Sequence, residues 1–98
     1  MVEYTNFLED LTYRLRDPVK AKSFLKVALE EYENDGDTQA LMLGLRCIAE
    51  AQGGIAKLAE KTNLNRQNLY KIFSCKITPR FDTLLLIIRG LGYRLQIA

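Results

Sequence analysis

Apolar residues recur every three or four positions along most of the chain, and this spacing predicts an all-α fold. The pattern predicts a short helix over about residues 4–15 and a second helix that begins at Asp17 and Pro18. Asp is favoured as an N-cap and Pro at the first helical position, so this pair marks a helix start. Residues 38–52 are apolar on most sides, which predicts a helix at the centre of the core. A further apolar helix is expected over residues 81–91, where glycines end it.

The polar segment 34–37 interrupts the helical pattern. Acidic residues flank Gly36, and they raise the alternative of a metal-binding loop. A calcium loop of the EF-hand type needs further oxygen ligands and a Glu at its twelfth position, and neither follows here. We therefore interpret the segment as a turn, with Asp37 as the N-cap of the next helix.

Residues 55–73 predict two short helices joined by a tight turn. The small side chain of Ala59 would let the helices cross closely. Asn63 falls in the turn, where a positive φ is needed and Asn is tolerated after Gly. Asn65 is placed to cap the second helix through its side-chain oxygen. The positions expected to face inward are Leu58, Ala59, Leu64, Leu69 and Ile72.

The outward positions of the second helix carry polar and basic side chains. Arg, Gln and Asn are the side chains that pair bidentately with base edges in the major groove of DNA. The helix pair therefore predicts a DNA-reading unit, in which the second helix enters the groove. The residues expected to face the DNA are Asn65, Arg66, Gln67, Asn68 and Lys71.

Charge is divided unevenly between the two ends of the chain, although the whole chain has a net charge of only +2. Residues 1–37 hold five Lys/Arg and nine Asp/Glu, a net of −4, and residues 38–98 hold nine and three, a net of +6. Within residues 54–80, six basic residues stand against Glu60 alone. This basic excess suits phosphate neutralisation, and the acidic end suits a basic partner. The alternative is that both are ordinary solvated surfaces.

The last residues, 93–97, alternate apolar and polar side chains and predict a short β-strand. A lone strand leaves its backbone groups without partners, so we expect it to pair with a second copy across a two-fold axis. Tyr93, Leu95 and Ile97 would then form part of a homodimer interface. The alternative is an extended, frayed tail. The complete prediction is one domain of five to six helices, with residues 1–37 as a helical extension and residues 38–98 as the core.

The residue inventory argues against an enzyme, a cofactor or a metal site. The chain has no His, no Gly-rich phosphate loop and no pair of a nucleophile and a base. Cys47 and Cys75 form no CxxC motif, and Cys47 lies in an apolar stretch that favours a role in the core. The N-terminus resembles no export signal, and no apolar run approaches the roughly 20 residues that span a membrane. We therefore expect a cytoplasmic protein.

Two stretches carry a resemblance to a known family: GGIAKLAEKTNLNRQNLYKIFS at residues 53–74 and PRFDTLLLIIRGLGYRLQI at residues 79–97. The chain resembles addiction-module antidote proteins, the HigA-like antitoxins of HigBA and RelE/ParE-type operons. The resemblance covers nearly the full length and is weakest before Asp17. It implies a helix-turn-helix of the Xre/Cro/CI kind, a dimer that represses its own operon, and a RelE/HigB-like toxin that the protein neutralises.

The same resemblance assigns base reading chiefly to Arg66 and Gln67. A Gln that often contacts phosphate in Xre-type proteins is replaced here by Ile55, and the usual Ser before the last helix is replaced by Arg80. We expect Thr78 to cap that helix instead. The residues expected to anchor phosphates are Lys57, Lys76 and Arg80.

Two other functions remain open at this point. A stand-alone Xre-type repressor would use the same helix pair, and a toxin-sized reading frame beside the gene would distinguish the antitoxin from it. A pure protein-binding module is the other alternative. It has no need of the outward Arg66, Gln67 and Lys71.

Overall fold

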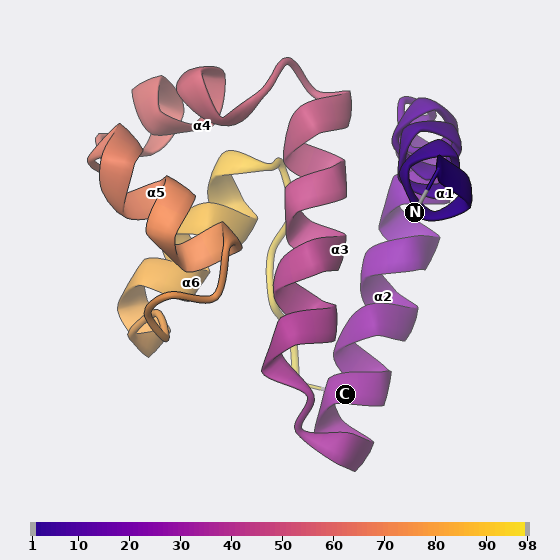
Figure 1. Ribbon diagram of the computed structural model, residues 1–98. Helices are drawn as coiled ribbons and strands as arrows, with labels where there is room; N and C mark the ends of the chain where they lie inside the picture. The colour runs from indigo at the N-terminus through magenta and orange to yellow at the C-terminus, as the bar shows by residue number, and fades with distance from the viewer. Residues whose placement is uncertain (1, 98) are drawn as a thin grey trace.

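The chain folds into six helices, seen in a computed structural model that describes the backbone of residues 2–97 and the side chains of residues 6–97. They are α1 (Val2–Arg14), α2 (Pro18–Asp35), α3 (Thr38–Ala51), α4 (Ile55–Thr62), α5 (Arg66–Phe73) and α6 (Phe81–Gly90) (Figure 1). No strand occurs in residues 2–97. The all-α prediction is confirmed, and the predicted helices lie within a few residues of the observed ones.

The start of α2 and the turn into α3 follow the capping rules. Asp17 precedes α2, and its carboxylate accepts a hydrogen bond from the Val19 amide at 2.9 Å. Gly36 ends α2 in the left-handed conformation, with φ of 67°. Asp37 then caps α3 by accepting from the Ala40 amide at 3.1 Å. The turn with its Asp37 cap is therefore confirmed, but it comprises only residues 36–37, because residues 34 and 35 still belong to α2.

Helix α3 is the centre of the core. It packs against α1 and α2 on one side and against α4 and α5 on the other, while α6 packs chiefly on α4. Figure 1 shows α3 standing between these two groups of helices. Half of its residues are buried, because other helices pack against it on both sides. The buried residues of α3 are Leu41, Met42, Gly44, Leu45, Cys47, Ile48 and Ala49.

Helices α4 and α6 approach each other closely at Gly90. A Cβ atom at this position would lie 2.5 Å from Thr62 Cγ2 and 2.8 Å from Leu58 Cδ1. Thr62 is held in place because its hydroxyl donates to the Leu58 carbonyl at 2.8 Å. Gly90 is therefore required by packing, and it fixes how α6 supports the α4–α5 pair.

The predicted strand over residues 93–97 is wrong: this segment is extended but forms no strand. The Tyr93 amide donates to the Ile88 carbonyl at 3.1 Å, which closes α6 rather than opening a ladder. The Tyr93 side chain is half-buried against the chain's own core, where burial raises its pKa. Leu95 and Ile97 are exposed. The alternating pattern is that of a strand with two faces, but residues 2–97 contain no second strand with which this segment could pair.

Candidate functional site

The turn between α4 and α5 is built by three side chains. Asn63 ends α4 with φ of 59°, in the left-handed conformation that its position in the sequence predicts. The Leu64 amide donates to the Thr62 hydroxyl at 3.3 Å, which keeps the turn compact. Asn65 then caps α5, because its side-chain oxygen accepts from the Asn68 amide at 3.1 Å. The predicted Asn63 turn and Asn65 cap are both confirmed.

The inner side of α5 rests on the core. Leu69, Ile72 and Phe73 are buried on this side. Leu58 of α4 is also buried, and Ala59 and Leu64 are half-buried against the core cluster. A short helix is marginal in isolation, so its stability comes from this packing. The inward positions predicted from the spacing therefore do anchor the pair.

The outer side of α5 is polar and exposed. Arg66, Gln67, Asn68 and Lys71 are all exposed, as the spacing predicts. Tyr70 also lies on this side, and the Arg66 guanidinium carbon is 5.9 Å from the centre of its ring. Such a contact is worth about 0.5–1 kcal/mol at an exposed site and limits the positions that Arg66 takes. The outer face therefore presents hydrogen-bonding groups on a rigid support.

Sequence reasoning missed Tyr70 as a member of this face. Its position relative to Arg66 was the available signal, since residues four apart on a helix are neighbours on the surface. An apolar ring directly after Leu69 is easily counted with the inward side chains instead. Its 46% exposure shows that it belongs to the outer face.

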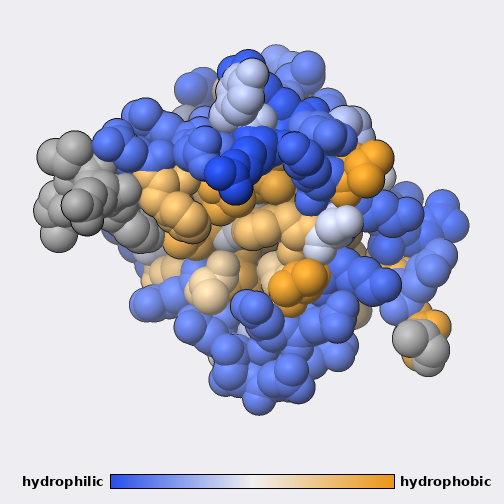
Figure 2. Space-filling model, turned by 90° about the vertical axis from the view of Figure 1, so that its right-hand side faces the viewer, coloured by the Kyte–Doolittle hydropathy of each residue, from blue (hydrophilic) through white to orange (hydrophobic). Residues whose placement is uncertain are grey.

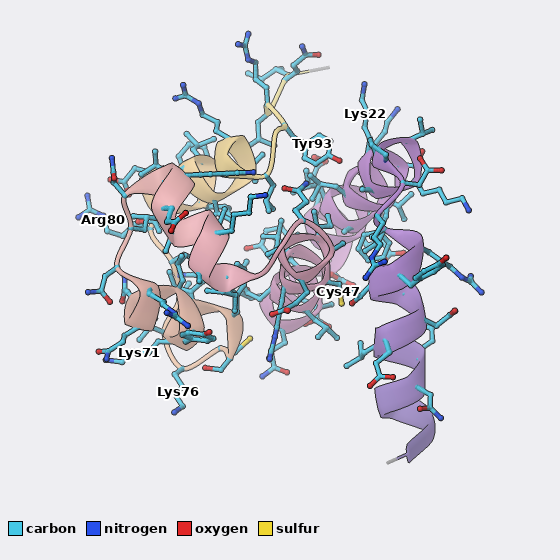
Figure 3. All side chains as sticks on the ribbon, turned by 90° about the horizontal axis from the view of Figure 1, so that it is seen from above. Lys22, Cys47, Lys71, Lys76, Arg80 and Tyr93 are labelled. Atoms are coloured by element: carbon cyan, nitrogen blue, oxygen red, sulfur yellow. The ribbon has the colours of Figure 1, made fainter. Side chains whose placement is uncertain are left out.

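The loop after α5 brings a further basic residue to this side. The Lys76 amide donates to the Lys71 carbonyl at 2.9 Å, and Cys75 takes a positive φ of 63° so that the chain can turn back. The side chains of Lys71 and Lys76 are both exposed. Figure 3 shows Lys71, Lys76 and Arg80 on the same side of the molecule, away from α1. The structure therefore places these three predicted cations on one side of the molecule.

The side chains of Arg80 and Lys57 are exposed, but each contacts another part of the chain. The Arg80 Nε atom is 3.4 Å from an oxygen of Asp82, in a pair whose side chains are 84% and 68% exposed. Lys57 is exposed on α4, and its side chain lies over Gly53. Thr78 does not cap α6, so that prediction is wrong: Arg80 occupies the N-cap position and makes no capping hydrogen bond with its side chain. Asp82, in the first turn of α6, places a negative charge near the positive N-terminal end of the helix dipole and stabilises the start of the helix.

The described part of the chain contains no cluster of three or more His, Cys, Asp or Glu side chains that would hold a metal ion. None of its helices has the length and apolar character needed to cross a membrane.

Comparison with known proteins adds one finding. No curated protein and no solved structure matches the chain. The sequence profile of one family, described as "probable addiction module antidote protein", matches residues 4–98. Because this match covers nearly the whole sequence, the chain belongs to the family of probable addiction module antidote proteins, the antitoxin members of toxin–antitoxin modules.

Proposed function

We propose that this antidote protein neutralises a RelE/HigB-like toxin and represses its own operon by binding duplex DNA through α5. In this proposal the α4–α5 pair is an Xre-type helix-turn-helix and α5 enters the major groove. The family match supports an antitoxin over a stand-alone repressor, because an antidote implies a toxin partner. Both activities belong in the cytoplasm, where the operon lies.

One observation carries the proposal for DNA. The exposed face of α5 consists of Arg66, Gln67, Asn68, Tyr70 and Lys71, all on a helix whose other side is buried. Arg binds guanine and Asn or Gln binds adenine through two hydrogen bonds each, and rigid placement preserves that geometry.

Phosphate contacts would come from the cations around α5. Lys71 and Lys76 are exposed on the same side, and Lys57 and Lys61 are exposed on α4. The Arg80–Asp82 pair is mostly exposed, and such pairs contribute about 0–1 kcal/mol, so a phosphate can replace Asp82. Each neutralised phosphate adds salt-dependent affinity that is independent of sequence.

A dimer completes the DNA-binding unit. One helix pair reads only a few base pairs, and two pairs related by symmetry read half-sites about 34 Å apart. The exposed side chains of Leu95 and Ile97, next to the half-buried Tyr93, support a joint at the C-terminal tail. Changing both Leu95 and Ile97 to Glu should give a monomer by light scattering, with helical circular dichroism unchanged and much weaker operator binding. A double variant that remains dimeric would exclude this joint.

The test of DNA reading uses the region upstream of the gene and two variants. Arg66→Ala should weaken specific binding by about 1–3 kcal/mol and relax base preference, because a base contact is lost. Lys76→Ala should weaken binding to all sequences equally and flatten the salt dependence. An Arg66→Ala protein that binds the operator as tightly as the wild type would refute the assignment of α5.

A further inference from the structure

A groove runs between α1 and α3, on the other side of α3 from the α4–α5 pair. Its volume is about 500 Å³, which is room for several side chains of a partner. We call it the α1–α3 groove. The residues that line it are Leu8, Glu9, Thr12, Tyr13, Arg16, Leu43, Arg46, Cys47 and Glu50.

The floor of the groove is apolar and uncharged. Leu8 and Leu43 are half-buried there, and Cys47 is buried. Burial raises the pKa of the Cys47 thiol, against the smaller opposing effect of a hydrogen bond with Thr12, so the thiol stays neutral at physiological pH. Apolar side chains of a partner would therefore displace water from this uncharged floor.

The rim of the groove carries the side-chain types that dominate binding energy in protein interfaces. Tyr13 is 67% exposed, and the Arg16 guanidinium carbon lies 5.3 Å from the centre of its ring. Tyr and Arg are enriched among the residues that contribute most to protein–protein affinity. Glu9, Arg46 and Glu50 also stand on the rim. An apolar floor inside a polar rim is the usual anatomy of a protein interface.

Further apolar side chains are exposed on α1 and α2. Phe7 is 60% exposed on α1, and Val27 is 52% exposed on α2. Figure 2 views the side of the molecule that carries α1 and α2, and it shows an apolar area bordered by hydrophilic side chains. Isolated apolar side chains are common on protein surfaces, but contiguous areas mark interaction sites.

Charge favours a basic protein partner over a second copy of this chain. Residues 1–37, which form α1, α2 and the turn into α3, have a net charge of −4, and this excess comes from the five acidic residues within 30–37, at the C-terminal end of α2 and in the turn after it. The groove lining itself is balanced, with Glu9 and Glu50 against Arg16 and Arg46, so the acidic end of α2 would attract a partner to this side rather than bind it in the groove. Two copies joined through this side would bring like charges together, whereas a basic partner would be attracted and oriented. The position of the groove agrees, because α3 separates α1 from the basic residues around α5 (Figure 3). A partner in the groove would leave α5 free for DNA.

We propose that the α1–α3 groove is where the toxin docks, through apolar side chains of a basic segment that fill the groove between Tyr13 and Leu43. This inference rests on the proposed antitoxin function and adds the surface that carries it. Removing residues 1–37 is not a clean test, because α2 buries Ala21 and Leu25 and packs on α3. Substitutions in the full chain are therefore used.

The experiment measures the binding of the full-length protein to the purified product of the toxin-sized reading frame beside its gene. Tyr13→Ala should raise the dissociation constant about tenfold or more, and Leu43→Glu about a hundredfold, because the latter places a carboxylate in an apolar floor. The matched controls are Tyr32→Ala on α2 and Ile77→Glu in the loop after α5, both at exposed residues outside the groove. Both controls should bind the toxin like the wild type.

Operator binding by the same proteins separates the two proposals. Tyr13→Ala and Leu43→Glu should keep wild-type operator affinity and helical circular dichroism. Ile77→Glu should bind the operator more weakly, because it places a carboxylate beside Lys76, which is proposed to contact phosphate. Toxin binding unchanged in both groove variants would overturn the groove assignment alone. A wild-type protein that binds no neighbouring gene product would overturn the toxin-binding part of the proposed function, and this inference with it. A Leu43→Glu protein that becomes monomeric yet still binds the toxin would assign the groove to a second copy.

Discussion

Helices α5 and α1 both lie on the surface and both expose polar side chains, but α1 leaves more apolar surface exposed. Helix α5 buries Leu69, Ile72 and Phe73 and exposes a polar face. Helix α1 exposes Phe7 and Tyr13 and has its Leu8 only half-buried in a groove. The polar side chains of the α5 face are well solvated without a partner, and they suit a hydrated, charged ligand such as DNA. The apolar side chains of α1 would be stabilised further if a partner covered them and removed them from water.

The largest expected difference between the two regions is in stability. Leu69 is fully buried beneath α5, so Leu69→Ala should lower the free energy of unfolding by about 2–5 kcal/mol. Leu8 is only half-buried, so Leu8→Ala should lower it by about 1 kcal/mol. Denaturant unfolding of the two variants measures both values. Equal losses would show that the α1–α3 groove is packed as tightly as the core, which would contradict the comparison.

The next effect concerns the support of the α4–α5 pair. Gly90→Ala should cost about 1–3 kcal/mol in unfolding free energy, because the new methyl group would overlap Thr62 and Leu58. Adding Thr62→Ser removes the nearer methyl group and keeps the hydroxyl that bonds the Leu58 carbonyl, so it should restore part of the loss. Thermal unfolding compares the single and double variants. A double variant no more stable than Gly90→Ala would place the strain elsewhere.

Much of the fold and of the α5 face could be predicted from the sequence, because local rules determine them. Asp17, Asp37 and Asn65 act as caps through bonds to residues two or three positions on, which spacing alone reveals. The outer face of α5 follows from helical periodicity. These features depend on a few neighbouring residues.

The errors concern features that depend on distant contacts. The alternation in residues 93–97 could not show that Tyr93 packs on its own core and that no strand is present to pair with it. Thr78 failed as a cap because the loop places Arg80 at the start of α6. The α1–α3 groove was also missed. Leu8 and Leu43 read as ordinary core positions, and only the packing of α1 on α3 leaves space between them.

Two N-cap variants distinguish a loss of stability from a loss of DNA binding, and their expected effects are smaller. Asn65→Ala and Asp37→Ala each remove an N-cap bond of 3.1 Å, so each should cost about 0.5–2 kcal/mol in unfolding free energy. Only Asn65→Ala should also weaken operator binding beyond what its loss of stability explains, because the start of α5, and not the start of α3, is proposed to contact the DNA. Gel-shift titrations of both variants check this. Equal operator affinities would count against a contact between the start of α5 and DNA.

The smallest expected effect compares the two Arg–Tyr contacts. Tyr70→Leu removes the ring beside Arg66, and Tyr13→Leu removes the ring beside Arg16. The loss of each exposed contact is worth about 0.5–1 kcal/mol. Tyr70→Leu should weaken operator binding by roughly that amount and leave toxin binding unchanged. Isothermal titration with each partner measures this, and a Tyr70→Leu protein with weakened toxin binding would show that the two faces are not separate.

The most direct test of the two-face account is amide chemical-shift mapping of the isotope-labelled protein with each partner in turn. Operator DNA should perturb the amides of residues 57–80, which include the α4 lysines, the start of α5 and the loop after it. The neighbouring gene product should perturb residues around Tyr13 on α1 and Leu43 on α3, with α5 unaffected. Perturbation of α5 by the toxin, or of α1 by DNA, would contradict the assignment of one face to each partner.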